Sequence, residues 1–419
     1  MTTTGISLDL AQELRAICGD NRVRERPTGG MYVSPSSAGE VAAVLALANR
    51  HGLSLSPAGG STERNAAEVH VDILLHTNRL ANIEHYDHGD LTVGVGSGMT
   101  ISELSAMLAP DRLMFAGDPP CPERCTIGGL LATASHGPLR HGYGSVRDYC
   151  IGIRFVTGDG RRAKGGGRVV KNVAGYDLMK LLIGSYGTLA VITSASFKLF
   201  PAPRQTRTFL AEFSTANEAM RFRDRVMHSP LSPMCMELVS PAARKLLRPE
   251  TNNDAWLICV RASGSDAVLN RYRKELGSAA TREIEGDSER RIWTAIENFG
   301  YTDPDDSSSL IYLSAWPREV NDVIDTLLAT SALAGVDTSL IGRVGVGLLL
   351  ARVTDRKRTA SEGTCALVHA LRGKYAERLA VKVRGATNPW PLTPANIASM
   401  KAVKHALDPN NVLRGRQIA

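Results

Sequence analysis

The chain of 419 residues is longer than one hydrophobic core usually serves, so its length predicts more than one domain. Hydrophobic residues make up 43% and charged residues 22%, a balance that excludes a largely disordered chain. The formal net charge is +7, but no basic run is long enough to indicate a nucleic-acid-binding arm. We therefore expect no nucleic-acid partner, and a dinucleotide, an anionic substrate or an acidic partner could each use the positive surplus.

The cysteines and the apolar stretches bear on the expected compartment. The seven cysteines are odd in number and widely spread, which is typical of reduced thiols and predicts a cytoplasmic protein. The N-terminus lacks a charged head followed by an apolar block, so we expect no signal peptide. The most apolar stretch, 344–351, is far shorter than the roughly 20 residues that span a bilayer, and predicts a buried strand or helix end.

The elements predicted before residue 204 alternate between strands and helices, with glycine-rich turns between them. In chain order they are a short amphipathic helix at 7–18, a strand at 32–33, a helix at 38–49, strands at 53–55, 69–75 and 91–95, a helix at 97–108, a strand at 150–156 that ends in a hairpin turn at 157–160, a helix at 176–183, and a pair of strands from 188 to 199.

After residue 204 the glycine-rich turns become rare and the pattern is that of an α+β domain. The predicted elements are helices near 215–228, 266–276, 319–334 and 361–372, strands near 209–213, 256–261 and 310–315, and a terminal helix at 394–407.

Two short glycine segments follow predicted strands. The segment 57–62 has the place and composition of an anion cradle, because glycines let backbone N–H groups approach a phosphate. Taken by itself, the segment is explained better by a plain strand-connecting turn. The segment 94–99 is close to the Rossmann fingerprint, but Met99 stands where the third glycine would allow close helix–strand packing, which weighs against NAD binding of that type.

Two longer segments are more specific. The segment 126–137, continuing to 143–148, mixes small residues, hydroxyls and glycines over a length that few structural loops reach. A flat aromatic cofactor with a diphosphate tail requires such a surface. The second segment runs from Arg168 to Thr193 and includes the run from Lys171 to Asp177.

These segments resemble the FAD domain of the vanillyl-alcohol-oxidase superfamily, also called the PCMH-type FAD-binding fold. The run from Lys171 to Asp177 is most similar to the FAD-binding subunit of bacterial glycolate oxidase. The resemblance implies an α+β protein. Its parts are a two-subdomain PCMH-type FAD-binding domain at 1–204, an α+β cap domain for substrate or interaction at 205–390, and a C-terminal helical tail at 391–419 that returns to the FAD domain.

The resemblance also implies which residues bind FAD. In the family, the stretch that matches 58–62 is the first diphosphate loop, the one that matches 126–137 wraps the flavin, and the one that matches 187–192 meets the adenosine by backbone contacts. The implied cofactor-binding residues are Ala58, Gly59, Gly60, Ser61, Thr62, Pro119, Thr126, Ile127, Gly128, Gly129, Thr133, Ser135, His136, Gly137, Tyr143, Gly144, Gly187, Val191 and Ile192.

The chain departs from the family pattern in three places. After Leu413 it continues with Arg414, so the asparagine that the family places near the flavin ring is missing, which weakens the expectation of flavin contact by this tail. Ala190 stands where a glycine is common. No His or Cys occupies the first loop in the way of relatives with covalent flavin, so we expect non-covalent FAD.

No metal site is predicted. The segment 85–90 offers several His and Asp side chains, but a solvated turn before a strand explains it better, since metal ligands need convergent geometry. Cys121 and Cys125 have no second matching pair, so a cysteine-only zinc or iron–sulfur site is not expected.

His136 is the histidine best placed to face a flavin, as a base for a hydroxyl proton or as a hydrogen-bond partner of the cofactor. Arg140, Arg343 and Arg384 are candidate anchors for a substrate carboxylate. The catalytic sister subunits of the family carry a Gly-Asp-Gly-Asn-type segment with metal-binding histidines in the cap region. The nearest echo here, 342–347, has no His or carboxylate, which makes independent hydroxy-acid chemistry doubtful.

The resemblance implies an FAD-dependent oxidoreductase acting on CH–OH groups, as a subunit of a glycolate-oxidase-type complex. The complex would oxidise a small 2-hydroxy acid, such as glycolate to glyoxylate, and pass electrons from the flavin to a sister FAD-binding flavoprotein subunit and an iron–sulfur subunit. We expect a cytoplasmic protein that meets the inner face of the membrane peripherally, through these partners. The alternatives are a non-catalytic flavin-carrying structural subunit, and a stand-alone oxidase of a sugar, a lactone or a D-2-hydroxy acid.

Overall fold

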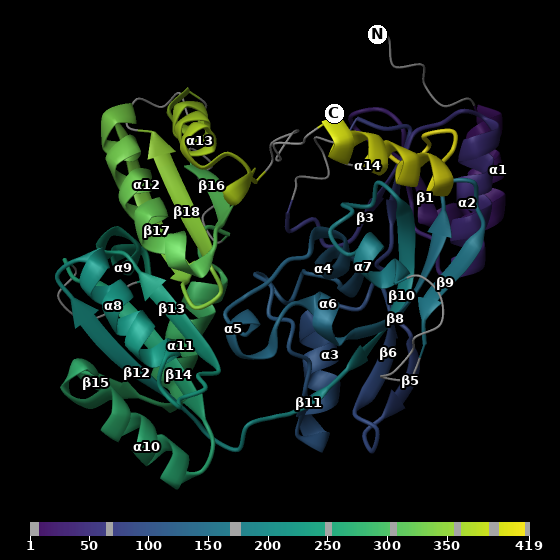
Figure 1. Cartoon of the computed structure of the whole chain (residues 1–419). Helices are drawn as coiled ribbons and strands as arrows, with labels where there is room; N and C mark the ends of the chain where they lie inside the picture. Colours follow the sequence, from purple (N-terminus) through teal and green to yellow (C-terminus); the bar gives the residue numbers. More distant parts are fainter. Residues whose placement is uncertain are drawn as a thin grey trace. The chain divides into compact units, whose positions relative to one another are not determined.

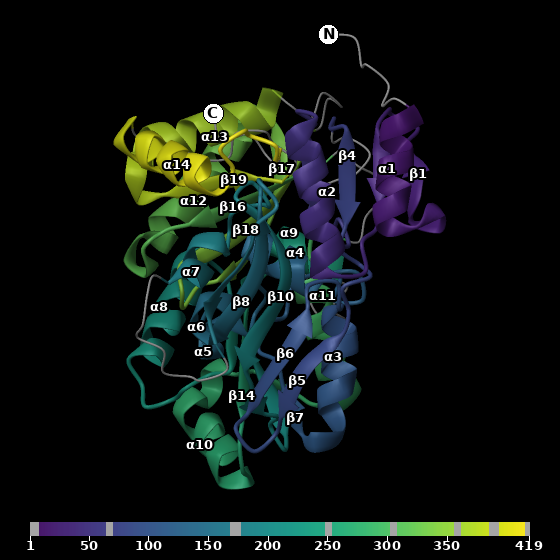
Figure 2. The same cartoon turned by 90° about the vertical axis from the view of Figure 1, so that its right-hand side faces the viewer.

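The structure is a computed structural model, and the chain in it divides into two compact units. Unit 1 comprises residues 1–136, 145–202 and 392–419, and unit 2 comprises residues 137–144 and 203–391. Figures 1 and 2 show the elements of both. The residues that the structure describes are 8–63, 70–167, 177–247, 254–301, 308–355, 362–384 and 394–414.

The first sheet of unit 1 contains the parallel strands of the strand–helix–strand pattern. β2 pairs with β4 and β4 with β3 in parallel, in the order β1-β2-β4-β3. Helix α2 (Ala38–Arg50) begins where the Ser37 side chain accepts a hydrogen bond from the Glu40 amide, and it packs through Val44 against Leu14 in the core. The strands are β1 (Val23–Glu25), β2 (Met31–Val33), β3 (Leu55–Ala58) and β4 (Ile73–His76).

The second sheet of unit 1 is antiparallel, in the order β5-β6-β10-β8-β9. The expected hairpin after Thr157 is confirmed, because β8 and β9 pair across it. The expected pair of strands at 188–199 is wrong, since one strand, β10, runs with a bulge between Ile192 and Ser194. The strands are β5 (Ile83–Asp87), β6 (Thr92–Gly96), β8 (Cys150–Thr157), β9 (Arg162–Gly166) and β10 (Ala190–Lys198).

Short helices and turns complete unit 1. Helix α3 begins at a capping box, in which Thr100 and Glu103 each bond the backbone N–H of the other. The Phe115 ring packs edge-on against Tyr149 and Phe197. The remaining elements are α1 (Leu8–Cys18), α3 (Ile101–Leu108), β7 (Leu113–Met114), α4 (Ile127–Thr133), α6 (Val146–Tyr149), α7 (Leu178–Leu182), β11 (Phe200–Pro201) and α14 (Pro394–Leu407). The expected motif at 168–176 lies outside the described residues.

The C-terminal segment joins the first sheet of unit 1. The Leu55 amide donates to the Val412 carbonyl at 2.8 Å, and the Arg414 amide donates to the Leu55 carbonyl at 2.7 Å. The buried Asp408 carboxylate holds this segment, because it accepts hydrogen bonds from the Val412 and Leu413 amides at 2.9 and 2.8 Å. The tail thus pairs with Leu55, the first residue of β3, and this strand leads into the glycine turn at 57–62.

The strands described in unit 2 form one antiparallel sheet in the order β15-β12-β14-β13-β17-β18-β16-β19. Strands β17 and β18 pair along their whole length, from Val336 to Arg343, whereas β13 and β17 pair only at Leu238 and Val239 of β13. The strands are β12 (Thr206–Phe213), β13 (Cys235–Val239), β14 (Trp256–Ser263), β15 (Arg282–Ile284), β16 (Ser308–Ser314), β17 (Val336–Arg343), β18 (Leu348–Asp355) and β19 (Ala380–Val383).

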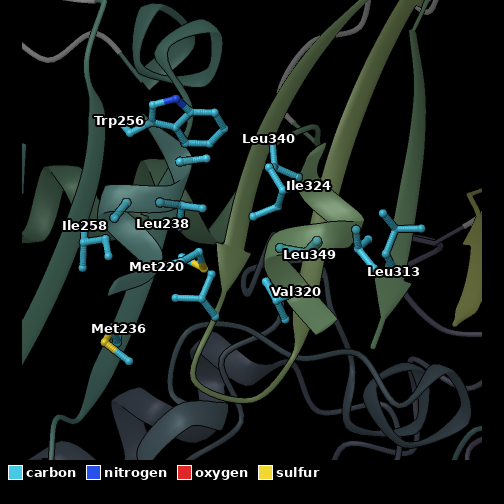
Figure 3. Packing of buried hydrophobic residues seen from close by; sticks show 14 of the residues in the cluster. Met220, Met236, Leu238, Trp256, Ile258, Leu313, Val320, Ile324, Leu340 and Leu349 are labelled. Carbon is cyan, nitrogen blue, oxygen red and sulfur yellow. The ribbon is translucent and has the colours of Figure 1, made fainter. Parts of the chain in front are cut away.

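Alternate residues of these strands form the main core of unit 2 with four of its helices. Met236 and Leu238 of β13 and Ile258 of β14 pack with Val320 and Ile324 of helix α12, as Figure 3 shows. The intervening residues point to the other face, which carries more polar side chains. The helices of unit 2 are α5 (Arg140–Tyr143), α8 (Ala216–Met227), α9 (Pro241–Leu247), α10 (Asp266–Leu276), α11 (Gly286–Glu297), α12 (Val320–Ala334) and α13 (Glu362–Tyr375).

Candidate functional site

Unit 1 contains a cleft of about 820 Å³, its open mouth included. Three chain segments line it: the turn at 57–63 after β3, helix α4, and the residues at 186–192 that lead into β10. These elements lie in the same half of Figure 1.

The turn after β3 is packed so closely that only glycine fits at two positions. A Cβ on Gly59 would lie 2.1 Å from the Thr126 Oγ1, and a Cβ on Gly60 would lie 1.6 Å from the Arg124 carbonyl oxygen. Ser61 adopts a left-handed conformation with φ of 55°. The turn is therefore held against the segment that begins α4.

The same turn presents unpaired backbone donors to the cleft. Among the described residues, the N–H groups of Gly59, Gly60 and Ser61 donate no hydrogen bond to another group of the protein. Buried backbone N–H groups are nearly always paired, so donors left open at a cleft need water or a ligand. Successive N–H groups in a turn are the groups that hold phosphate oxygens in proteins.

Helix α4 forms the second wall. The Thr126 side chain caps the helix by accepting a hydrogen bond from the Gly129 amide at 3.2 Å. A Cβ on Gly128 would lie 3.0 Å from the Ser97 Cβ, so this glycine is needed for packing. A Cβ on Gly129 would lie 3.2 Å from the Thr126 Oγ1, the neighbour found within 4 Å. Gly129 is therefore open toward the cleft.

The third wall precedes and begins β10. Tyr186 and Gly187 both have positive φ, 56° and 72°, and the Tyr186 amide donates to the Ala132 carbonyl of α4 at 2.7 Å. A Cβ on Gly187 would lie 2.5 Å from the Pro57 Cγ, so the third wall touches the first turn. All three walls are therefore fixed to one another by close backbone contacts.

The lining fits a dinucleotide cofactor. The open N–H groups of the turn suit phosphate oxygens, and Pro57, Ala132, Ala190 and Ile192 supply apolar surface for flat rings. Small residues at the narrow points allow a ligand to approach the backbone closely. The fit rests on the chemistry of these donors and walls.

Comparison with known proteins identifies the cofactor. A family model described as an FAD binding domain matches residues 30–166, which carry the first two walls of the cleft. The chain therefore contains an FAD binding domain over these residues. The family resemblance inferred from the sequence and the expected FAD cofactor are thereby confirmed.

Similar proteins include enzymes of hydroxy acids. The chain is 35% identical over 231 residues to D-lactate dehydrogenase of Archaeoglobus fulgidus, covering 54% of this chain and 51% of that protein. It is 37% identical over 155 residues to glycolate oxidase subunit GlcE of Escherichia coli, covering 36% and 44%. The chain thus spans about half the length of these two relatives. Glycolate oxidase subunit GlcD of Bacillus subtilis is 24% identical over 422 residues, covering 91% and 87%.

Solved structures confirm the expected fold. 4-Ethylphenol oxidase from Gulosibacter chungangensis superimposes with a TM-score of 0.77 at 15% identity, covering 99% of this chain and 98% of that one. p-Cresol methylhydroxylase gives the same TM-score and identity, covering 98% and 97%. The α+β architecture of the PCMH-type FAD-binding fold is therefore the architecture of this chain.

Many of the residues expected to bind FAD lie together in the cleft. They are Ala58, Gly59, Gly60, Ser61, Thr62, Thr126, Gly128, Gly129, Thr133, Gly187 and Ile192. The side chains of Ile127 and Val191 are fully buried in the protein interior instead. Pro119, Ser135 and His136 do not line the cleft, and Gly137, Tyr143 and Gly144 belong to unit 2. Contact of these residues with FAD stays a prediction.

Six residues that line the cleft were not predicted to bind FAD: Pro57, Glu63, Thr77, Ala132, Tyr186 and Ala190. For two of them, Thr77 and Ala132, the sequence contains a signal that predicts the position. Thr77 follows β4, the parallel neighbour of β3, and the carboxyl ends of parallel strands share one edge of a sheet. Ala132 lies three residues after Gly129 on α4, and hence on the same helical face. Tyr186 reaches the cleft only through a tertiary contact.

The candidate catalytic side chains are not gathered in this cleft. His136 is half-buried and is the last residue of unit 1 before residues 137–144, which belong to unit 2. In unit 2, Arg343 is 3% exposed with its Nε 3.4 Å from a Glu237 carboxylate oxygen, and Arg384 lies over the Tyr301 ring at 4.3 Å. Arg140 belongs to helix α5 of that unit. Roles for these residues in catalysis or substrate anchoring stay predictions.

The other constellations have structural explanations. A Cβ on Gly94 would lie 2.2 Å from the His85 ring, so this histidine lies flat against β6. Strand β6 is antiparallel to both its neighbours, which is not the parallel arrangement of a Rossmann site. Burial raises the pKa of the Cys125 thiol to about 12, and a hydrogen bond from Thr62 opposes the rise. Over the described ranges, no group of three or more His, Cys, Asp or Glu could hold a metal ion.

Among the described residues, every helix is too short or too polar to cross a membrane.

Proposed function

We propose that unit 1 binds FAD non-covalently in the cleft and that the protein takes part in the oxidation of a small 2-hydroxy acid, such as glycolate to glyoxylate. The observation that carries the proposal is the row of open N–H groups at Gly59, Gly60 and Ser61, within the residues that the FAD family model matches. When bound, FAD supplies the acceptor for the two electrons that leave a hydroxyl-bearing carbon as it becomes a carbonyl.

The residues of the cleft have separate tasks in this proposal. The N–H groups of the turn hold the diphosphate oxygens, because no lysine or arginine lines the described cleft to do so. Ala132, Ala190 and Ile192 exclude water from the cofactor rings. Tyr186 and Gly187 fix the third wall against the first turn.

The side chains that line the cleft support non-covalent binding of FAD. No Cys or His belongs to the lining of the cleft as the structure describes it. In the family that the sequence resembles, His and Cys are the side chains that bind flavin covalently. Acid should therefore release all flavin from the protein.

The substrate class and the partners rest on the relatives. One is named D-lactate dehydrogenase, and two are named subunits of glycolate oxidase. We infer that the chain is a flavin-carrying subunit, that unit 2 serves as the cap domain for substrate or interaction, and that electrons pass to a sister flavoprotein and an iron–sulfur subunit. His136 is the candidate base in this assignment, and FAD contact by Pro119, Ser135, Tyr143 and Gly144 belongs to it as well.

The first experiment is the absorption spectrum of the purified chain, followed by acid precipitation. A yellow protein whose flavin appears in the supernatant as FAD supports the proposal. A colourless protein that fresh FAD does not reconstitute, or flavin that remains in the pellet, contradicts it.

The second experiment is stopped-flow reduction of the bound flavin by glycolate and by D-lactate. We expect very slow reduction of the chain alone and faster reduction after the sister flavoprotein and the iron–sulfur protein are added, because a base and a substrate anchor supply large parts of a rate enhancement. Rapid reduction of the chain alone would restore a self-sufficient dehydrogenase.

A further inference from the structure

A second hollow region of unit 1 lies along its antiparallel sheet. Two clefts of about 1400 and 620 Å³, their open mouths included, share Glu84, Arg154 and Lys164. They therefore form one continuous depression. We call it the basic groove and define it by Glu84, Gly152, Arg154, Arg162, Lys164 and Ser194.

Three cations of the groove share one face of the sheet. Arg154 of β8 stands directly opposite Lys164 of β9, and Arg162 precedes Lys164 by two residues. Side chains two residues apart on a strand point to the same side, and so do directly paired residues. The three positive side chains thus line one surface.

The floor between the cations is made of short side chains. Arg154 stands opposite Ser194 of β10, and the next pair on the same face is Gly152 with Ser196. Ile192 and Ala190 of the same strand line the cofactor cleft, whereas Thr193 and Ser194 line the groove. The groove therefore begins one strand position from the cofactor cleft, on the other side of the bulge in β10.

The groove carries more positive charge than its fold requires. Glu84 is the carboxylate in its lining, and it pairs with Arg154 at 3.0 Å. Arg162 and Lys164 are exposed and form no ion pair with any residue that the structure describes. Like charges directly opposite one another destabilise an antiparallel pair, so the fold gains nothing from Lys164 beside Arg154. An anion in the groove would offset this repulsion.

We propose that the basic groove docks an acidic segment of a partner protein, lying in extended form over the short side chains of β8 and β10. This deepens the proposed function, because it rests on the partner subunits inferred there. An extended peptide suits an open depression with a floor of glycine and serine, and its carboxylates match the exposed Arg162 and Lys164. A nucleotide suits it less, because the Phe155 ring is 2% exposed and the His85 ring lies against Gly94, which leaves little aromatic surface for a base.

The test uses fluorescein-labelled hexaglutamate as the probe and fluorescence anisotropy of the full-length holoprotein. The variant is R162E/K164E, which reverses two exposed charges of the groove. The matched control is R271E/K274E, which reverses two exposed charges on α10 of unit 2. We expect the wild type to bind and the groove variant to bind at least about tenfold more weakly, because both reversed charges would repel the peptide. The control should change less than about twofold, because its reversed charges lie outside the groove.

Several outcomes decide the proposal. Binding that weakens steeply with added salt in the wild type supports it, as does unchanged flavin content in both variants. Equal loss of binding in both variants shows attraction to net charge alone and overturns it. Inorganic tripolyphosphate that displaces the peptide at far lower concentration than hexaglutamate itself makes the groove a phosphate site and also overturns it.

Partner-dependent oxidation of the 2-hydroxy acid is measured separately in the same proteins. No peptide binding together with full partner-dependent oxidation overturns the groove and leaves the proposed function in place. Peptide binding by a protein whose flavin reduction needs no partner overturns the function that the proposal deepens.

Discussion

The two units treat their polar groups in opposite ways. In unit 1, the donors of Gly59, Gly60 and Ser61 face a cleft without a partner among the described residues. In unit 2, buried charges close on one another: the Arg244 guanidinium donates to Glu212 at 2.7 Å, and the Arg261 Nε donates to Glu289 at 3.1 Å.

This difference separates a site that awaits a ligand from a buried carboxylate, that of Glu289, whose two oxygens already accept hydrogen bonds. Open backbone donors at a cleft gain their partners only when something binds. A buried ion pair whose oxygens are all used offers nothing to a ligand, and removing one partner leaves an uncompensated charge. Substitutions in the cleft of unit 1 should therefore alter FAD binding, and substitutions in the network of unit 2 should alter stability.

The sharpest way to break the comparison is Gly129→Val. The new side chain would enter the cleft from α4, where a Cβ meets the Thr126 Oγ1 at 3.2 Å and no backbone atom within 4 Å. We expect a folded chain with FAD affinity reduced roughly tenfold to a hundredfold, since overpacking costs about 1–3 kcal/mol and 1.4 kcal/mol is tenfold. Flavin content after purification and titration of the apoprotein with FAD measure the effect.

The matched control for this change is Gly39→Val, which also replaces a glycine in the first turn of a helix in unit 1. A Cβ on Gly39 would have the Ser37 Oγ at 3.7 Å as its neighbour within 4 Å. We expect full flavin content in this control. Normal flavin content in Gly129→Val as well would show that α4 is not a wall of the cofactor site.

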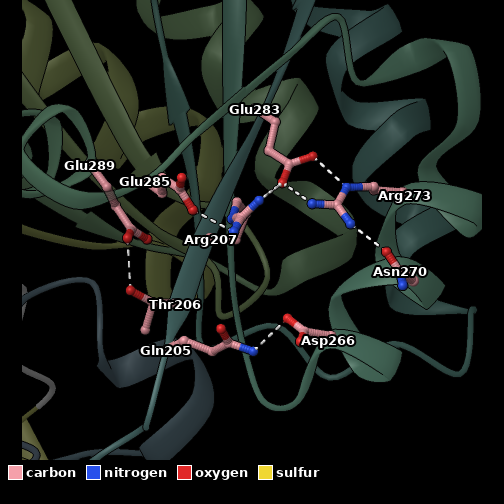
Figure 4. Close-up of polar contacts among 9 residues, drawn as sticks. All are labelled: Gln205, Thr206, Arg207, Asp266, Asn270, Arg273, Glu283, Glu285 and Glu289. Atoms are coloured by element: carbon pink, nitrogen blue, oxygen red, sulfur yellow. Dashed lines mark hydrogen bonds and ion pairs between the residues drawn. The ribbon is translucent and has the colours of Figure 1, made fainter.

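The largest effect on stability is expected from Glu289→Ala in unit 2. Glu289 is 3% exposed, and its carboxylate accepts hydrogen bonds from Thr206 at 2.7 Å, Thr208 at 2.8 Å and Arg261 at 3.1 Å. Figure 4 shows the contact with Thr206. Breaking such a buried pair from one side costs about 3–5 kcal/mol, which urea denaturation followed by circular dichroism would measure.

Arg290→Ala provides the control on the same helix. Its side chain is 70% exposed and pairs with Asp287 one turn away. We expect a change of less than about 1 kcal/mol there, as for most surface ion pairs. A similar loss in both variants would mean that the network of Glu289 contributes no more than a surface pair, and the contrast between the units would fail.

The sequence predicts the elements whose signals are local. Helices α2 and α12 follow from apolar spacing, the β8–β9 hairpin from its turn residues, and the cradle at 57–62 from glycines after a strand. Strand β5 was missed because an edge strand with exposed positions has the polar composition of a loop. The sequence predicted two strands where the structure has only β10. The interruption between them is a bulge at Thr193, where hydroxyl residues interrupt the apolar pattern without ending the strand.

The residues of the candidate site also differ in whether a local sequence signal predicts them. Glycines that touch backbone in the fold, such as Gly59 and Gly187, are visible in the sequence because no other residue tolerates such contact. Tyr186 is not, since it reaches the cleft through a hydrogen bond to Ala132, more than 50 residues earlier in the chain. The charge network of unit 2 was also not predicted, because its members come from β12, β14 and α11 and meet only after folding.

A smaller effect is expected at Asp408, which tests whether part of unit 1 is also self-contained. Its carboxylate is 1% exposed and accepts from Val412, Leu413 and, at 2.5 Å, the Lys404 Nζ. We expect Asp408→Ala to lower the free energy of unfolding by about 2–3 kcal/mol, since hydrogen bonds to a charged group contribute about 1.5–3 kcal/mol. Urea denaturation gives the loss.

Added FAD distinguishes the two units in that experiment. A ligand that binds only the folded state raises stability, so FAD should restore part of the loss in Asp408→Ala, where the damaged segment borders Leu55 and the cleft beyond it. It should restore less in Glu289→Ala. Equal recovery of both variants would contradict independent unfolding of the two units, because a ligand of the folded state stabilises everything that unfolds together with its site.

The smallest effect is a pH dependence at Glu283 in unit 2. A hydrogen bond from Arg273, with another from Arg207, holds the pKa of the Glu283 carboxyl below its usual value of 4.5, although partial burial opposes this. Figure 4 shows both arginines bonded to it. Because the folded-state pKa is the lower one, the stabilisation is complete above pH 4.5 and disappears as the pH falls through the folded-state value.

Glu283→Gln should therefore lower the free energy of unfolding by less than about 1 kcal/mol above pH 4.5, and the gap to the wild type should narrow in more acidic solution. Arg273→Gln removes the main cause of the shift, so its stability should vary less with acid than that of the wild type. Urea denaturation at pH values on both sides of 4.5 measures all three proteins, and a gap between wild type and Glu283→Gln that stays constant with pH would show that the arginines do not favour the charged carboxylate.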